Sequence, residues 1–238
     1  GGQRQDRRSR NHSEIPPLVV FTNGGHRDRH PPIRPHTAVA PLVLTASMDT
    51  PADPRAFFEA ARASGDKWNY GTPGIGTVAH LGMELLKSRA GLGAVHVPYP
   101  GNPQVIAAMV GGQIQMSLLP PGLAMAQVRG GKLRAVGVTS AGRSGVVPEV
   151  PSLGEAGIKD FQLEIWNAVA APNSLPKAHV NRLSALLTDI VRRPDVREKI
   201  LNQGWTVAGT SPEGLARRVK ADTEAMAEVI RRNNIRPS

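Results

Sequence analysis

Between residues 39 and 139, short β-type apolar runs alternate with segments of helical periodicity, and only short connections separate them. The pattern predicts strands at 39–45, 67–70, 94–98, 113–118 and 133–139, and helices at 55–63, 77–89, 102–110 and 122–129. Regular alternation of this kind is typical of a parallel α/β layer with right-handed crossovers. The sequence therefore predicts an α/β fold for this part of the chain.

After residue 140 the pattern changes. We expect a loop at 142–151, a short helix directly after it, and an extended run at 161–171. The remaining pattern predicts a short strand at 205–207 and helices at 176–192, 194–203 and 212–232. A mostly helical C-terminal third that follows an α/β unit indicates two lobes.

The composition excludes several classes of protein. None of the 238 residues is Cys, which excludes disulfide scaffolds, thiolate metal sites and Cys nucleophiles. The longest candidate apolar run, Ala38–Ala46, contains Pro41 and is far shorter than the roughly 20 residues that a membrane helix needs. No G-x-S-x-G or H-E-x-x-H motif is present, so we expect no enzymatic activity, no cofactor and no metal site.

Residues 1–36 form an atypical basic segment. They carry seven Arg against three acidic residues, within a chain whose net charge is +10. Arg-rich segments can bind phosphate backbones, but this one lacks interleaved aromatic residues, and no zinc-finger, RRM or KH pattern follows it. No apolar stretch follows its basic residues, so we expect no signal peptide in this chain. We interpret the first 14 residues as a solvated tail and expect no nucleic-acid partner.

The glycine-rich turn Gly71-Thr-Pro-Gly-Ile-Gly76 stands between an expected strand and an expected helix. Unpaired backbone N–H groups and the helix dipole favour a carboxylate or a phosphate at such a place. The hydroxyl groups of Thr72 and Thr77 can add hydrogen-bond donors. A P-loop would need Lys where Thr77 stands, which excludes that interpretation.

Three interpretations of the turn remain open. Gly74-Ile-Gly-Thr-Val-Ala79 matches a dinucleotide fingerprint, but the acidic residue that should follow the next strand is absent, since no acid lies between Glu84 and Glu149. A tight turn without a ligand is the second interpretation. Capture of a small anion is the third, and the residues favour it.

Several ordered motifs resemble one family. They are Tyr70-Gly-Thr-Pro-Gly-Ile-Gly-Thr-Val-Ala-His80, Val95-His-Val-Pro-Tyr-Pro-Gly101, Gly131-Lys-Leu-Arg-Ala-Val-Gly-Val-Thr-Ser140, Arg143, Val147-Pro-Glu-Val-Pro-Ser152, Glu155-Ala-Gly157, Trp166 and Ala171-Pro172. In this order they resemble the Bug-type periplasmic solute-binding proteins of tripartite tricarboxylate transporters. The resemblance runs from about Ala38 to Ile235.

The resemblance implies a type II periplasmic-binding-protein fold, in which two α/β lobes close on a small carboxylate or dicarboxylate. It implies a periplasmic monomer that delivers its solute to a membrane permease of the tripartite tricarboxylate type. Carried over residue by residue, the ligand-binding positions of the second lobe are Tyr70, Gly71, Thr72, Pro73, Gly74, Ile75, Gly76, Thr77, His80 and Tyr99. From the residues alone, His80 is more often a packed or capping residue, and Tyr99 is as readily a packing residue as a cleft residue.

The N-terminal part departs from the family. Leu18–Asp28 resembles the family's first strand and loop, which would add Thr22, Asn23, Gly24, Gly25 and Asp28 to the ligand-binding positions. The match then vanishes until Ala38, where relatives have a much longer segment. Residues 18–28 are thus either the remnant of a shortened first lobe or unrelated sequence that mimics the motif.

We therefore expect one nearly complete α/β lobe, residues 37–165, and the helical C-terminal part of a truncated first lobe, residues 166–238. Apolar side chains of the helix after Pro176 would then lack partners: Leu183, Leu186, Leu187, Ile190 and Val191. Leu118-Leu-Pro-Pro121 replaces a polar pair of the family, which should weaken or change ligand selection. The alternative functions are a truncated homologue that binds nothing and a nucleotide-binding α/β enzyme.

Overall fold

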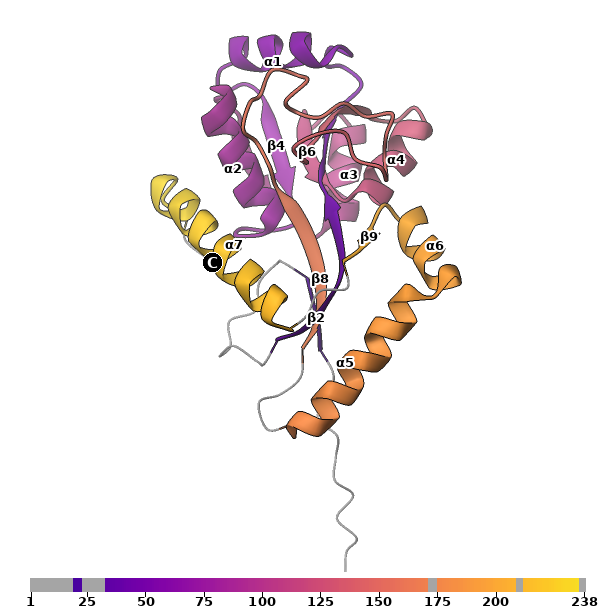
Figure 1. Cartoon of the computed structure of the whole chain (residues 1–238). Coiled ribbons are helices and arrows are strands. Elements are labelled where there is room, and N and C mark those ends of the chain that lie inside the picture. Colours follow the sequence, from indigo (N-terminus) through magenta and orange to yellow (C-terminus); the bar gives the residue numbers. More distant parts are fainter. Residues whose placement is uncertain (1–18, 23–32, 171–174, 209–211, 236–238) are drawn as a thin grey trace, which may run out of the picture.

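The computed structural model describes residues 19–22, 33–170, 175–208 and 212–235. These residues form a mixed α/β structure with two sheets (Figure 1). The four-stranded sheet has the order β1-β8-β2-β9 and is antiparallel throughout: β1 (Val19–Thr22), β2 (Ile33–Pro41), β8 (Glu164–Ala170) and β9 (Thr206–Val207). The expected strand near residue 18 is therefore present as β1, paired with β8.

The five-stranded sheet has the order β5-β4-β6-β3-β7. Its strands are β3 (Val43–Ala46), β4 (Asn69–Thr72), β5 (Val95–Pro98), β6 (Met116–Leu119) and β7 (Arg134–Val138). Its helices are α1 (Pro54–Ala63), α2 (Val78–Ala90), α3 (Asn102–Val110) and α4 (Pro121–Arg129). The predicted alternation of strands and helices is confirmed, with boundaries that differ by a few residues.

Three predictions about this part were wrong. The expected strand 39–45 is two strands, β2 and β3, which lie in different sheets. The layer is not wholly parallel, because β3 enters it directly from the other sheet and runs antiparallel to β6 and β7. Ser152 forms an isolated bridge with Val138 and residues 153–157 form turns, so the short helix expected after Pro151 is absent from this described segment.

Local signals explain how α1 begins and which face it buries. The Asp53 side chain accepts a hydrogen bond from the Ala56 N–H at 2.9 Å, and Pro54 occupies the first turn, where a missing N–H costs nothing. The helix buries Phe57 and Phe58, whose rings meet edge to face at 5.4 Å. Burying such side chains stabilises the fold by about 1.5–3 kcal/mol each.

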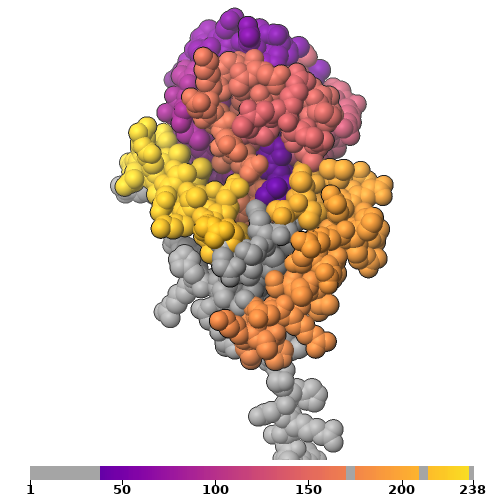
Figure 2. Space-filling view, viewed as in Figure 1, coloured from indigo at the N-terminus to yellow at the C-terminus, as the bar shows by residue number. Residues whose placement is uncertain are grey.

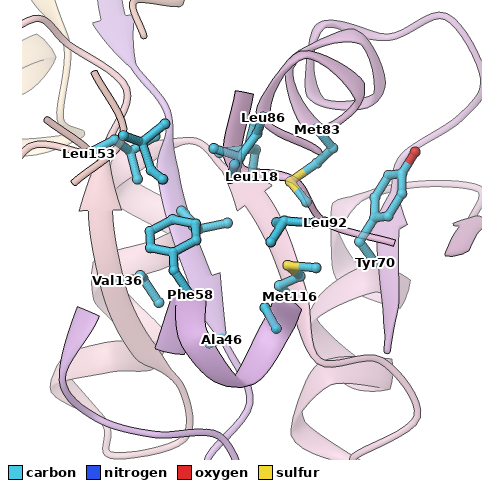
Figure 3. Close-up of a cluster of buried hydrophobic side chains, with 14 of the residues drawn as sticks. Ala46, Phe58, Tyr70, Met83, Leu86, Leu92, Met116, Leu118, Val136 and Leu153 are labelled. Carbon is cyan, nitrogen blue, oxygen red and sulfur yellow. The ribbon is translucent and has the colours of Figure 1, made fainter. Parts of the chain in front are cut away.

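Two hydrophobic clusters cover the two faces of the five-stranded sheet. Leu44 and Leu118 lie in the cluster under α1 and α2 (Figure 3), while the adjacent Val43 and Leu119 lie in the cluster under α3 and α4. Successive residues of a strand point to opposite faces, so both faces of this sheet are buried. This explains why every residue of β3 and β6 is buried, without an alternating exposed face.

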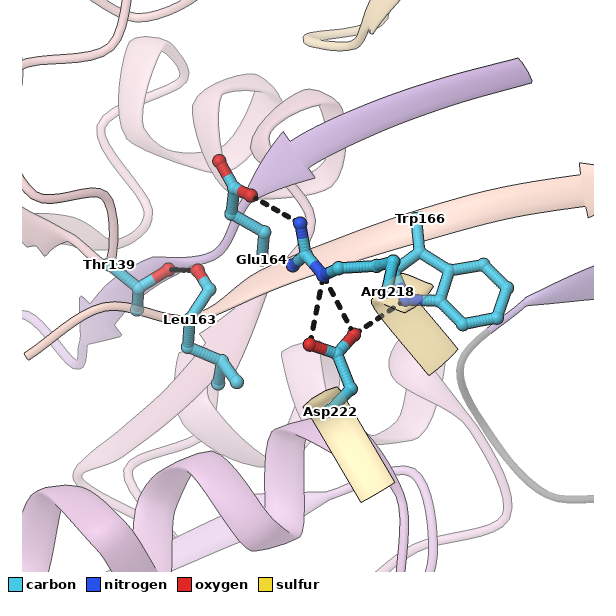
Figure 4. A network of polar contacts seen from close by, with 6 residues as sticks. All are labelled: Thr139, Leu163, Glu164, Trp166, Arg218 and Asp222. Carbon is cyan, nitrogen blue, oxygen red and sulfur yellow. Dashed lines mark hydrogen bonds and ion pairs between the residues drawn. The ribbon is translucent and has the colours of Figure 1, made fainter. Parts of the chain in front are cut away.

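Two chain segments pass from one sheet to the other, one at Leu42 before β3 and one at Leu163 before β8, and both bond to Thr139. The Leu42 N–H donates to Thr139 Oγ1 at 2.8 Å, and the same hydroxyl donates to the Leu163 carbonyl at 2.6 Å (Figure 4). Thr139 is fully buried. One hydroxyl group therefore ties the chain that enters the five-stranded sheet to the chain that leaves it.

The sheet pairings bear on the lobe boundary. Residues 38–41 pair with β8 in the four-stranded sheet, although they fall within the expected second lobe, 37–165. β2 and β3 form one extended run that is interrupted only at Leu42. The pairing with β8 therefore assigns residues 38–41 to the four-stranded sheet. We therefore propose that the second lobe begins at Leu42 and ends near Leu163.

The C-terminal helices are α5 (Lys177–Arg192), α6 (Pro194–Asn202) and α7 (Pro212–Arg232). Figure 2 shows α7 on one flank of the molecule and α5 and α6 on the other. Val191 of α5 is buried, whereas Leu186 and Ile190 are 50% and 46% exposed. The expected lack of partners was therefore wrong for Val191. Leu183 and Leu187 are half-buried, and only Leu186 and Ile190 of the five side chains are largely exposed. Within the described residues, no helix has the length and apolar character needed to span a bilayer.

Candidate functional site

A cavity of about 290 Å³ lies between the two sheets. One side comes from the five-stranded sheet and its helices, and the other from β8 and the residue before β9. The lining residues are Leu42, Pro73, Thr77, Val78, Ala79, Asn102, Leu118, Pro120, Ile165, Trp166 and Trp205. Clefts between lobes are common positions for ligand sites, and this volume is at the lower end of the usual range.

Three helices begin at this cavity. β4, β5 and β6 are parallel, so their carboxyl ends meet at one edge of the sheet, and α2, α3 and α4 begin just beyond them. The residues at these helix starts that line the cavity are Thr77, Val78 and Ala79 for α2, Asn102 for α3 and Pro120 for α4. Each helix N-terminus carries about half a positive charge, so the three together create a positive potential there.

The described first turns of these three helices carry no charge that offsets this potential. None of α2, α3 and α4 has an acidic residue in its first turn. The N-cap positions of α3 and α4 make no side-chain capping bond. Among the described contacts, the backbone N–H groups of Val78 and Ala79 have no partner, as is usual for the first turn of a helix. These N–H groups remain available to an anion.

The glycine-rich turn is closed by its own hydrogen bonds. The hydroxyl groups of Thr72 and Thr77 both lie within hydrogen-bond distance of the Gly74 carbonyl, at 3.1 and 2.8 Å. Thr72 Oγ1 also lies 2.7 Å from His96 Nε2. A hydroxyl has a single hydrogen, and in this structure the turn uses it. The role of the two hydroxyls as donors to a ligand stays a prediction.

Two glycines in this region are required for different reasons. Gly76 has a φ of +78°, in the left-handed region that other residues adopt at a cost, and its surroundings are open. At Gly71 the constraint is close packing, because a Cβ there would lie 2.3 Å from Ile114 Cδ1 and 3.1 Å from Tyr99. Gly76 thus shapes the turn, whereas Gly71 lets two side chains pack over β4.

A buried polar cluster lies next to the turn and includes Tyr70, Glu84 and Lys87. The Tyr70 hydroxyl donates to Glu84 Oε1, and Lys87 pairs with the same oxygen at 2.9 Å. Burial and the Glu84 carboxylate raise the pKa of Tyr70 above its usual value. Burial acts to raise the pKa of Glu84, but hydrogen bonds from Tyr70 and Lys87 outweigh it and lower that pKa. Tyr70 therefore lies in the core, with its hydroxyl engaged away from the cavity.

His80 and His96 complete this cluster. Their rings stack with centroids 4.0 Å apart, and His80 Nδ1 accepts a hydrogen bond from the Gly76 N–H at 3.1 Å. Burial lowers the pKa of both side chains, and the repulsion from His80 contributes to lowering that of His96 to about 4. Both rings are thus neutral near pH 7. His80 stabilises the turn by accepting the hydrogen bond from the Gly76 N–H.

We expect the stability of the protein to fall as the pH is lowered from 7 to 5. An unfolded His takes up a proton near pH 6.5, whereas folded His96 does so only near pH 4, so protons favour the unfolded state between these values. The midpoint of thermal unfolding, measured at several pH values, should decrease less steeply in His96→Gln. The exposed His179→Gln serves as the control, and an equal slope in all three proteins would contradict the prediction.

Trp166 reaches the cavity from β8 and is held by a polar network (Figure 4). Its indole Nε1–H donates to Asp222 at 2.8 Å. Arg218 pairs with Asp222 at 2.8 Å and with Glu164 at 3.1 Å. α7 thereby fixes the orientation of an aromatic wall of the cavity.

The structure brings only some of the expected positions to the cavity. Pro73 and Thr77 line it, and the backbone of the turn adjoins it, whereas His80 is buried as a cap. Tyr99 packs over Gly71. Ile75 is 40% exposed. Thr22 ends β1, and Asn23, Gly24, Gly25 and Asp28 lie outside the described residues.

Sequence reasoning missed Asn102 and Trp205. Asn102 begins α3, and its Oδ1 is buried without a partner among the described residues, although the residue borders the cavity. Its place directly after Pro-Gly and the strand β5 repeats the strand-turn-helix arrangement of the glycine turn, which could have identified it. Trp205 gave no local signal. No group of His, Asp and Glu within the described part of the chain could hold a metal ion.

Comparisons with known proteins agree on one family. The family model described as "Tripartite tricarboxylate transporter family receptor" matches residues 28–235. A protein of Pseudomonas sp. strain P51, named for the tcbD-tcbE intergenic region, is 34% identical over 200 residues, which are 80% of this chain and 60% of the relative. Protein BugT of Bordetella pertussis is 26% identical over 80% of this chain and 59% of its own length.

Solved structures show the same fold. The periplasmic binding protein BugD has a TM-score of 0.81 at 22% identity, covering 93% of this chain and 79% of its own. The Rhodopseudomonas palustris protein Rpa4515, solved with adipate, has a TM-score of 0.83 at 22% identity and the same coverage. MatC from Rhodopseudomonas palustris, solved with malate, has a TM-score of 0.80 at 24% identity, covering 90% of this chain and 78% of its own. The chain therefore has the two-lobed fold of periplasmic binding proteins.

Proposed function

Because the chain belongs to the tripartite tricarboxylate transporter receptor family, we propose that it binds a small carboxylate in the cavity between its two sheets and delivers it to a membrane permease. The observation that carries this proposal is the meeting of three helix N-termini at one cavity without an acidic residue in any first turn. A carboxylate placed there would receive hydrogen bonds and a favourable electrostatic potential together.

The backbone supplies the main donors. The N–H groups of Val78 and Ala79 are free among the described contacts, and Asn102 can turn its amide to present its nitrogen. Hydrogen bonds to a charged acceptor contribute about 1.5–3 kcal/mol each, more than bonds between neutral groups. A few such bonds would hold a small anion without a Lys or Arg in the site.

Closure of the two lobes would complete the site. Trp166 and Ile165 come from the four-stranded sheet, while Thr77, Asn102 and Pro120 come from the opposite side. A ligand that contacts both sides favours the closed arrangement over the open one. The crossing segments joined by Thr139 are the connection about which such a motion would occur.

Relatives support the biological setting of the proposal. Structural neighbours are a periplasmic binding protein and proteins bound to adipate and malate. We propose that this protein acts in the periplasm, as a monomer, with a permease of the tripartite tricarboxylate type as its partner. The chain spans 60% of the length of the Pseudomonas relative.

Binding can be tested with two ligands that share an alkyl chain and differ in the charge and hydrogen bonding of the head group. Hexanoate should raise the thermal unfolding midpoint and give a measurable Kd by calorimetry, whereas hexanamide should do neither, because it lacks the anion that the helix ends attract. At 100 times its Kd, a ligand adds about 2.7 kcal/mol of stability.

Adipate, malate and NAD complete the set of ligands. Binding of NAD without any carboxylate would favour a nucleotide site instead. A protein that binds none of these compounds would overturn the proposal and favour the non-binding homologue.

A further inference from the structure

The cavity is polar at one side only. Thr77 and Asn102 are the polar members of its lining, and both lie at the helix starts. The rest of the lining is apolar, and no Lys, Arg, Asp or Glu from the described residues belongs to it. A ligand in this cavity therefore meets one anion-binding end and otherwise hydrocarbon and aromatic surface.

The apolar wall comes from both lobes. Leu118 and Pro120 supply it at the end of β6, and Ile165, Trp166 and Trp205 supply it from the opposite side. Leu118 is fully buried beneath this wall, so the partly exposed side chains of Ile165, Trp166 and Trp205 supply most of the surface that a ligand would contact. Aromatic and aliphatic side chains of this kind favour an apolar ligand body by removing its surface from water.

The arginine in the polar network around Trp166 already has two acidic partners. Arg218 lies beside Trp166 in Figure 4, but it pairs with Glu164 and Asp222 and does not line the cavity. A second carboxylate on the ligand would find no described cation to pair with. Against this apolar wall it would also lose hydration without gaining hydrogen bonds, which is unfavourable.

We propose that this cavity selects monocarboxylates with an apolar body over dicarboxylates and hydroxy acids. The proposal rests on the carboxylate-binding function proposed above and names the class of substrate. The carboxylate lies at the helix starts, and the alkyl or aromatic body lies against Ile165, Trp166 and Trp205. The ligand is small, as the volume of about 290 Å³ requires.

The test compares hexanoate with adipate, two six-carbon acids that differ in the second carboxylate. Calorimetric titration of the unmodified chain should give a Kd for hexanoate at least about tenfold lower than for adipate. Benzoate should also bind more tightly than malate. Adipate or malate binding as tightly as hexanoate would overturn the selectivity and leave the carboxylate-binding function standing, whereas no binding of any acid would overturn both.

Trp205→Ala tests the wall directly. Removal of this ring should raise the Kd for hexanoate about tenfold, because less of the alkyl chain is removed from water. Leu201→Ala is the matched control, since Leu201 is a large apolar residue of α6 that is 51% exposed and does not line the cavity. Wild-type affinity of Trp205→Ala for hexanoate would contradict the proposal.

Discussion

Gly76→Val is expected to lose carboxylate binding while the rest of the fold is retained. Gly76 has a φ of +78°, and a Cβ at this position would have no atom within 4 Å, so the substitution acts through the backbone and not through a clash. A β-branched residue in this region costs about 1–3 kcal/mol, and the unliganded turn would relax to lower that cost in part. Binding would have to restore the original turn, which corresponds to a loss of affinity of about five- to 150-fold.

Gly112→Val provides the matched control for this prediction. Gly112 has a φ of +71° and equally open surroundings, but it lies in the turn between α3 and β6, at the sheet edge opposite to the cavity. Both variants should be destabilised to a similar degree in thermal unfolding, and only Gly76→Val should lose affinity for hexanoate in calorimetry. If Gly76→Val kept its affinity, or if both variants lost it equally, the glycine turn would not be the anion site.

Thr139→Val is expected to lower the free energy of unfolding by about 2–4 kcal/mol, although the two side chains have nearly the same shape. The hydroxyl that it removes accepts from the Leu42 N–H and donates to the Leu163 carbonyl, and all of these groups are buried. Each buried polar group left without a partner costs about 1–3 kcal/mol. Chemical denaturation, followed by circular dichroism, measures the change.

Two further variants distinguish the loss of the Thr139 hydrogen bonds from the loss of any threonine hydroxyl. Thr139→Ser keeps the hydroxyl and should recover most of the stability. Thr223→Val removes an exposed hydroxyl that donates to the Val219 carbonyl within α7, and it should change the free energy of unfolding little. Near-equal stability of Thr139→Val and the wild type would show that the Thr139 bonds do not hold the crossing segments together.

The local sequence predicts the elements around the cavity well. Asp53-Pro54, the glycines after β4 and the apolar periodicity of α2 are signals within a few residues of the element that they form. These local signals are enough to predict α1, β4 and α2 without any long-range contact. The antiparallel direction of β3 could not be predicted in this way, because it depends on where the chain enters the sheet and not on the residues 43–46 themselves.

The site shows the same division. Sequence by itself determined that a glycine turn at 71–76 precedes a helix and exposes N–H groups, because backbone conformation at glycine and helix starts is a local property. Only the tertiary structure decided that the starts of α3 and α4 join it, since parallel strands bring their carboxyl ends to one edge of the sheet. It also decided that the threonine hydroxyls turn inward and that Trp166 and Trp205 form the opposite wall, because these contacts join residues far apart in the chain.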